Sequence, residues 1–140
     1  MKNILLIIML LSTFGHSEMT RDDDGILTDL DSSLEWDDTE NKIRRNWGDA
    51  IKYCTDLKLG THNDWRLPNI NELMTVTNYI PEDRVWHEAF MQNTVANLYW
   101  TSTTVYKSSR DGWAINFKTG RTDNTAKSHA FRLRCVRTSS

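Results

Sequence analysis

The sequence predicts an α+β domain, with short strands near both ends of the chain and two helices between them. Two observations predict the helices: an apolar stripe at spacings of three and four that begins at Trp47, and an Asn-Ile-Asn-Glu capping motif at residues 69–72. A third observation predicts the strands. Residues 99–106 and 113–117 are rich in aromatic and β-branched side chains, and an alternating apolar pattern follows near the C-terminus.

The first 17 residues have the pattern of a secretory signal peptide. Lys2 is followed by an apolar run from Ile4 to Leu11 and by a small-residue exit that ends at Ser17, so we expect cleavage before Glu18. The alternative is a membrane anchor, but the run is well short of the roughly 20 residues that span a bilayer. We therefore expect an exported protein, periplasmic or at the cell surface. Its mature part, residues 18–140, is expected to form one domain without a membrane span.

The chain has two cysteines, Cys54 and Cys135, and this isolated pair favours a structural disulfide in an oxidising compartment. The alternatives are a catalytic thiol or a metal site. There is no Cys-x-x-Cys motif, and His62, His87 and His129 show no ligand spacing near either cysteine. We expect neither a metal nor another cofactor.

The mature chain is predicted to open with a β-hairpin. Residues 18–24 are polar and expected to fray, whereas residues 25–30 and 34–36 are predicted strands joined by an Asp-Ser-Ser turn. The acidic run at residues 22–25 lacks the register of a calcium-binding loop. We interpret it as an acidic strand entry, with weak calcium binding as the alternative.

The first helix is predicted to run from Trp47 to about Leu59, with Asn46 as its N-cap and Gly60 as its end. Its apolar stripe belongs to the core and turns Cys54 inward.

The second helix is predicted to begin after Asn69 and to end at Pro81. The stretch before it contains Trp65, Arg66 and Pro68, which we interpret as a structural motif. The Arg66 side chain is expected to bind loop carbonyls or the acidic hairpin, with Trp65 packed beneath it. Binding of an anion by Arg66 is the alternative.

Beyond the second helix the sequence predicts a long loop at residues 82–97, in which Trp86 is expected to be exposed. A strand at residues 99–106 follows and carries Trp100. A polar turn at residues 107–112 is expected to separate it from the strand at residues 113–117.

The C-terminal part is predicted to contain a turn at residues 118–120, a polar loop at residues 121–128 and a closing strand at residues 130–137. In this strand the side chains of Phe131, Leu133 and Cys135 are expected to face inward. The arginines between them are expected on the other face.

The charge is distributed unevenly, although the formal net charge is −2, or −3 once Lys2 is removed with the signal peptide (16 basic against 19 acidic side chains). Residues 18–40 carry ten acids against Arg21, and residues 107–140 carry eight bases against two acids. We favour pairing of the two ends with each other or with solvent; the alternative is a basic face for a polyanion. No nucleic-acid partner is expected.

Several motifs occur in a characteristic order: Leu34-Glu35-Trp36, Trp47 with Ala50 and Tyr53-Cys54, Asp64 to Asn69 with Glu72-Leu73, Tyr99 to Thr103, Trp113 to Phe117 with Gly120, and Arg134 to Arg137. This order resembles the Lcl C-terminal domain family of exported bacterial proteins over roughly residues 24–137. The end of the chain also looks like that of the sulfatase-modifying-factor domains, which have a C-type-lectin-like fold.

The resemblance implies two helices packed on a twisted antiparallel sheet, a C-type-lectin-like fold and a Cys54–Cys135 bridge. It implies a non-enzymatic module in the periplasm or at the cell surface. Because the family takes its name from the head domain of a collagen-like adhesin, it also implies sulfated glycans as a ligand class. No binding residue carries over from a shared motif.

The first functional hypothesis is a module that binds anionic glycans. Five basic residues in or beside the last loops are the candidate ligand-binding residues: Lys107, Arg110, Lys118, Arg121 and Lys127. Arginine suits bidentate contacts with sulfate or carboxylate, and the nearby rings of Tyr106 and Trp113 suit sugar faces. Ordinary loop solubility is the alternative explanation of these charges.

The second hypothesis, an enzyme, is disfavoured because no nucleophile, zinc or phosphate-loop motif occurs. His62 with Asp64 and His87 with Glu88 are the near pairs, and we interpret both as ordinary loop residues. The third hypothesis is a protein–protein docking domain of the envelope, since tryptophan is enriched at interaction anchors. The sequence leaves the oligomeric state open.

Overall fold

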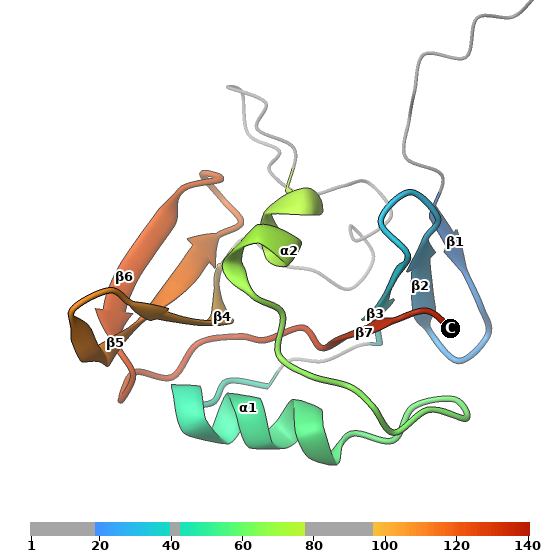
Figure 1. The fold of residues 1–140 in the computed structure, drawn as a ribbon, viewed down its shortest axis with the longest axis horizontal. Coiled ribbons are helices and arrows are strands. Elements are labelled where there is room, and N and C mark those ends of the chain that lie inside the picture. The colour runs from blue at the N-terminus through green and yellow to red at the C-terminus, as the bar shows by residue number, and fades with distance from the viewer. Residues whose placement is uncertain (1–18, 40–42, 78–96) are drawn as a thin grey trace, which may run out of the picture.

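The computed structural model describes residues 19–39, 43–77 and 97–140, and it confirms an α+β domain with two helices (Figure 1). The predicted signal peptide lies outside the described residues. So do Pro81, Trp86, His87 and nearly all of the predicted loop at residues 82–97.

The strands near the two ends of the domain share one antiparallel sheet. It contains β1 (Met19–Arg21), β2 (Ile26–Asp29), β3 (Leu34–Asp37) and β7 (Val136–Thr138) in the order β1-β2-β3-β7. The predicted N-terminal hairpin is therefore confirmed. The expectation that residues 18–24 fray is wrong for residues 19–21, because their backbone pairs with β2.

A second antiparallel sheet contains β4 (Leu98–Val105), β5 (Ser108–Asn116) and β6 (Thr122–Ala126) in the order β4-β5-β6. The predicted turn at residues 107–112 is wrong: Tyr106 and Lys107 alone make the turn, and β5 begins at Ser108. The predicted loop at residues 121–128 is also wrong, because β6 pairs with β5 over five residues. β6 lies at the edge of this sheet with exposed polar side chains, so it has no apolar alternation to identify it.

The first helix, α1 (Trp47–Asp56), begins at the predicted cap, where the Asn46 side chain accepts a hydrogen bond from the Asp49 amide. It ends earlier than predicted, at Leu57, which is extended and donates its N–H to the Cys54 carbonyl. Gly60 does not end the helix. It lies in the following turn with φ = 58°, a conformation that glycine adopts without steric cost.

The second helix, α2 (Ile70–Thr75), has the predicted capping box. The Asn69 side chain accepts from the Glu72 amide, and the Glu72 carboxylate accepts from the Asn69 amide. The helix ends at Thr75, earlier than the sequence predicts, since Val76 and Thr77 are not helical.

Two hydrophobic cores lie on opposite faces of the strands. The core beside α2 contains Leu27, Leu34, Trp36, Leu73, Val76, Tyr99, Ile115, Phe117 and Val136. The core beside α1 contains Ile26, Ala50, Cys54, Trp65, Leu67, Trp100, Ala114, Leu133 and Cys135. Sequence neighbours such as Tyr99 and Trp100 therefore belong to different cores. Strands β2, β4 and β5 contribute side chains to both cores. So does the C-terminal segment, through Cys135 and through Val136 of β7.

The C-terminal segment, residues 131–138, runs from the second sheet to the first, where it ends as β7 (Figure 1). Phe131 pairs with Arg45, and Arg132 pairs with Tyr99, before the segment reaches β7. The predicted closing strand is thus regular at residues 136–138 alone. The predicted alternation is also wrong, because residues 133–137 are all buried.

The predicted disulfide between Cys54 and Cys135 is confirmed, with the two Cα atoms 5.4 Å apart. It joins α1 to the C-terminal segment across 81 positions of sequence. In the chain-entropy model a loop of this size corresponds to about 4.5 kcal/mol of stabilisation.

Replacement of Trp65 by alanine is expected to unfold most of the protein. Trp65 is 2% exposed and lies in the core beside α1, and loss of a buried tryptophan costs about 3–5 kcal/mol. The free energy of unfolding of a whole domain is typically about 5–15 kcal/mol. A loss of this size therefore leaves little net stability to a domain at the lower end of that range. The measurement is thermal unfolding followed by circular dichroism. Tyr106→Ala, at a side chain that is 85% exposed, is the control and should melt as the unmodified protein does. A near-native melting temperature for Trp65→Ala would contradict this assignment.

Candidate functional site

The five candidate cations lie at two opposite ends of the second sheet. Lys107 and Arg110 are at the β4–β5 turn, and Lys127 joins them because its N–H donates to the Arg110 carbonyl at 2.9 Å. Lys118 and Arg121 lie in the turn between β5 and β6. The strand between Arg110 and that turn is six residues long, roughly 20 Å at 3.3 Å per residue. The five cations therefore do not form one continuous face.

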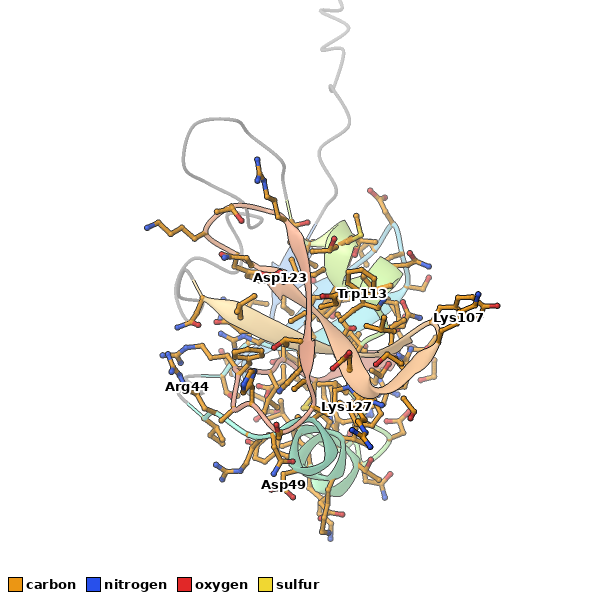
Figure 2. All side chains as sticks on the ribbon, turned by 90° about the vertical axis from the view of Figure 1, so that its left-hand side faces the viewer. Arg44, Asp49, Lys107, Trp113, Asp123 and Lys127 are labelled. Atoms are coloured by element: carbon orange, nitrogen blue, oxygen red, sulfur yellow. A yellow bond between two sulfur atoms is a disulfide. The ribbon has the colours of Figure 1, made fainter. Side chains whose placement is uncertain are left out.

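The basic tip, which we define as Tyr106, Lys107 and Arg110, is the most exposed part of the β4–β5 hairpin. The Tyr106 side chain is 85% exposed, and the Lys107 Nζ lies 5.3 Å from the centroid of its ring. Figure 2 shows Lys107 projecting outward from the end of the hairpin. The tip thus presents an aromatic face and two cations to solvent.

The shape of the tip comes from a bulge in β5. The pairing register changes from Thr104–Gly112 to Val105–Ser108, which leaves residues 109–111 without opposite partners on β4. The Ser108 hydroxyl donates to the Asp111 carboxylate at 2.7 Å across this bulge. The bulge displaces Arg110 from the regular ladder and brings it to the same end of the sheet as Tyr106.

Lys127 differs from the other candidates because its ammonium is occupied within the protein. The Nζ atom lies 3.7 Å from the centroid of the Trp47 ring. It donates hydrogen bonds to the Thr104 hydroxyl and to the Ser109 carbonyl, both at 2.9 Å. An ammonium has three N–H donors, so these three contacts use its whole capacity.

The basic residues nearest the C-terminus pair with the acidic hairpin, as we favoured from the charge distribution. Arg137 binds Glu35 and also donates from Nε to the Asp64 carboxylate at 2.7 Å. This hydrogen bond from Arg137 lowers the pKa of Asp64 below its usual value. The pairing leaves the second sheet as the place where the C-terminal excess of positive charge is exposed.

Arg134 is fully buried, yet its guanidinium group has partners in the last residue of β3 and in the two residues that follow it. It donates to the carbonyls of Asp37 at 3.1 Å and Thr39 at 2.8 Å, and it lies 3.5 Å from the Asp38 carboxylate. Burial lowers the pKa of Arg134. These contacts fix the end of the hairpin to the C-terminal segment and give Arg134 a structural role.

Arg66 pairs with Glu72, which differs from the expected binding to loop carbonyls or the acidic hairpin. Its two terminal nitrogens donate to the two Glu72 oxygens at 2.7 and 2.6 Å, the bidentate geometry that guanidinium favours. Burial alone would raise the pKa of Glu72, but hydrogen bonds from Arg66 and from the Asn69 amide outweigh it and lower the pKa. The ion pair therefore reinforces the capping box of α2.

The other residues of this motif hold neighbouring segments together. The Pro68 carbonyl accepts a hydrogen bond from the Ser102 amide at 2.8 Å. The indole N–H of buried Trp100 donates to the Arg45 carbonyl at 2.9 Å. These contacts agree with a structural role for Pro68 and Trp100, and burial in the core beside α1 agrees with one for Trp65.

Among residues 19–39, 43–77 and 97–140, no group of three or more His, Cys, Asp and Glu side chains is arranged to hold a metal ion. In the acidic run, Asp22 accepts a hydrogen bond from the Ile26 amide at 2.8 Å. The described helices include none that is long and apolar enough to cross a membrane.

A shallow groove of about 400 Å³ runs along α1. Its lining residues are Arg45, Asp49, Lys52, Tyr53, Asp56, Leu57 and Lys58. Cations and carboxylates alternate along it, and Lys52 pairs with Asp56. The groove therefore lacks the uniform positive charge of the basic tip.

Comparison with known proteins gives one family match. The family model described as the Lcl C-terminal domain matches residues 25–137, which is most of the chain. No curated protein matches the sequence.

Replacement of Glu72 by glutamine tests the Arg66 ion pair, because glutamine keeps the capping-box hydrogen bond but lacks the charge. At pH 7 we expect a loss of about 1 kcal/mol in the free energy of unfolding, a modest value since Arg66 is half exposed. The pKa of Glu72 is lowered in the folded state. Its contribution is therefore complete above the unfolded pKa of roughly 4.3 and is lost as the pH falls through the folded pKa. Urea unfolding at pH 7 and pH 3 measures the difference between the two proteins, which should shrink at pH 3.

The matched control is Asp123→Asn, which makes the same chemical change on exposed β6 and should alter stability little at either pH. An equal loss for Glu72→Gln at both pH values would show that the ion pair contributes nothing.

Proposed function

Because the chain belongs to the Lcl C-terminal domain family, we propose that it is an exported, non-enzymatic binding module of the bacterial envelope or cell surface. Its proposed ligands are anionic glycans, in particular sulfated ones. The proposed binding site is the basic tip of the β4–β5 hairpin.

The exposure of Tyr106 carries this proposal. A tyrosine that is 85% exposed buries almost none of its ring in the fold, although burial of aromatic surface is favourable. Its ring lies beside the Lys107 ammonium, with Arg110 presented by the adjacent bulge. A sugar ring can stack on the tyrosine face while its sulfate groups bind the two cations, and the arginine provides bidentate hydrogen bonds.

The disulfide supports export. Disulfides persist in oxidising compartments and are rare in the cytosol, and both cysteines of this chain are used in one bridge. The bridge also supports a non-enzymatic role, because neither thiol is available as a nucleophile. His62 lies 3.9 Å from Glu35, and Asp64 binds Arg137, so His62 and Asp64 are each oriented toward other partners.

We also propose that the fold is C-type-lectin-like. The pairing of the N-terminal hairpin with the C-terminal strand β7 in one sheet supports this. So does the second sheet, which carries its exposed hairpin at one end.

Arg110→Glu is expected to abolish most binding to a sulfated polysaccharide, whereas Arg121→Glu is expected to retain most of it. The two variants make the same charge change at opposite ends of β5, and the strand between them is roughly 20 Å long. That distance exceeds the screening length of about 8 Å at physiological salt. The measurement is binding of the purified oxidised protein to dextran sulfate, with unsulfated dextran as the matched ligand control, at low and physiological salt.

Tyr106→Ala should weaken binding with no change in net charge, which separates stacking from general electrostatic attraction. Equal losses for Arg110→Glu and Arg121→Glu would contradict a site at the basic tip. Absence of salt-sensitive binding to any anionic glycan would contradict glycan recognition and would favour a protein partner.

A further inference from the structure

Lys127 contacts three other parts of the chain: the bulge of β5, the start of α1 and the end of β4. Its backbone N–H donates to Arg110 in the bulge of β5, and its carbonyl accepts from the amide of Trp47, the first residue of α1. Its side chain reaches Thr104 near the end of β4 and Ser109 in the bulge. Figure 2 shows Lys127 between the second sheet and α1.

The Trp47 ring, which the Lys127 ammonium contacts, is itself held in place by the sheet. The Trp47 indole N–H donates to the Thr101 carbonyl at 2.9 Å. The ring also lies so close to Gly112 that a Cβ atom there would be 3.0 Å from the Trp47 Cδ1 atom. Trp47 therefore cannot move toward the sheet, and a cation held on its ring face has a defined position. A cation over a tryptophan face is attracted by about 0.5–2 kcal/mol.

Lys127 contacts the hairpin at the place where the β4–β5 pairing is irregular. Residues 109–111 have no opposite partners on β4, so backbone pairing to β4 does not hold this part of the hairpin. On the other side of β5, pairing begins at Asp111, opposite Ala126 of β6. The two oxygens that Lys127 binds, on Thr104 and Ser109, lie on either side of the turn that carries Tyr106 and Lys107. The ammonium thus bridges the base of the basic tip.

We propose that Lys127 is a positioning residue: its ammonium, bound to Thr104, Ser109 and the Trp47 ring, holds the basic tip in the conformation that binds the ligand, and it does not contact the ligand itself. This inference deepens the proposed glycan-binding function and rests on it for its effect on affinity. The three contacts of the ammonium, by contrast, are independent of any ligand. Ordering a loop before binding increases affinity because less conformational entropy is lost on association.

The first test uses the unmodified, oxidised protein. Amine-reactive labelling, quantified by mass spectrometry, should modify Lys127 at least about ten-fold more slowly than Lys118, because three protein contacts hold its ammonium. Equal labelling rates would show that these contacts do not hold the Lys127 ammonium. This measurement needs no variant and no ligand.

The second test compares Lys127→Met, Lys127→Arg and Lys118→Met. Methionine keeps an unbranched chain but lacks charge and donors, so amide hydrogen exchange at residues 105–111 should accelerate by about ten-fold or more. Exchange in β2 and β3 should not change. Lys127→Arg keeps a cation for the Trp47 face and should restore part of the protection. Lys118→Met removes the same charge at the other end of the sheet and should leave exchange unaltered.

The binding measurement separates positioning from bulk charge. With dextran sulfate as the probe, Lys127→Met should lose about ten-fold in affinity, while Lys118→Met should lose about two-fold or less because exposed charges at that distance are screened. Equal losses, or unchanged exchange at residues 105–111, would overturn the positioning role. If the unmodified protein does not bind dextran sulfate, the proposed function fails, and labelling and exchange still decide whether Lys127 holds the tip.

Discussion

The fold depends on the C-terminal segment, residues 131–138, which provides backbone partners to several otherwise separate elements. It pairs with the residue before α1's cap, with β4, with Arg66 before α2, and with β3, and Cys135 joins it covalently to α1. Because buried N–H and C=O groups must be satisfied, the position of this segment fixes where each of these elements lies. The two sheets are therefore parts of one domain, although they have separate strand orders.

Burial of residues 133–137 in this segment explains why two of its arginines are paired inside the protein. An unpaired guanidinium group in a protein interior costs several kcal/mol, so buried Arg134 requires the carbonyls and the carboxylate at the end of β3 and just beyond it. Arg137 similarly lies between Glu35 and Asp64. The acidic N-terminal hairpin thus provides counter-charges for the end of the chain. The exposed basic residues of the C-terminal part lie in the turns and the bulge of the second sheet: Lys107, Arg110, Lys118 and Arg121.

The sequence predicts the parts of this fold that depend on local chemistry. Asn46 and Asn69 cap their helices as expected, since a cap involves one side chain and amides three residues away. The alternation expected at residues 130–137 fails because each face of that segment meets a different core. β6 was unpredictable from its own residues, because its pairing with β5, and not an apolar pattern, makes it a strand. The disulfide was predictable because the chain has two cysteines and both lie on inward faces.

The candidate site also depends on pairing between strands, which the sequence does not predict. Five cations have similar chemistry in the sequence, and the sheet register gives them different positions. It places Lys118 and Arg121 at one end and the basic tip at the other, and it brings Lys127 to the bulge beside Arg110. Ordering a turn on association costs conformational entropy. The Lys127 ammonium contacts Thr104 and Ser109, on the two sides of the turn that carries Tyr106. In the proposed site, a turn held in this way has less backbone entropy to lose when the ligand binds, so an exposed tip can still bind its ligand with useful affinity.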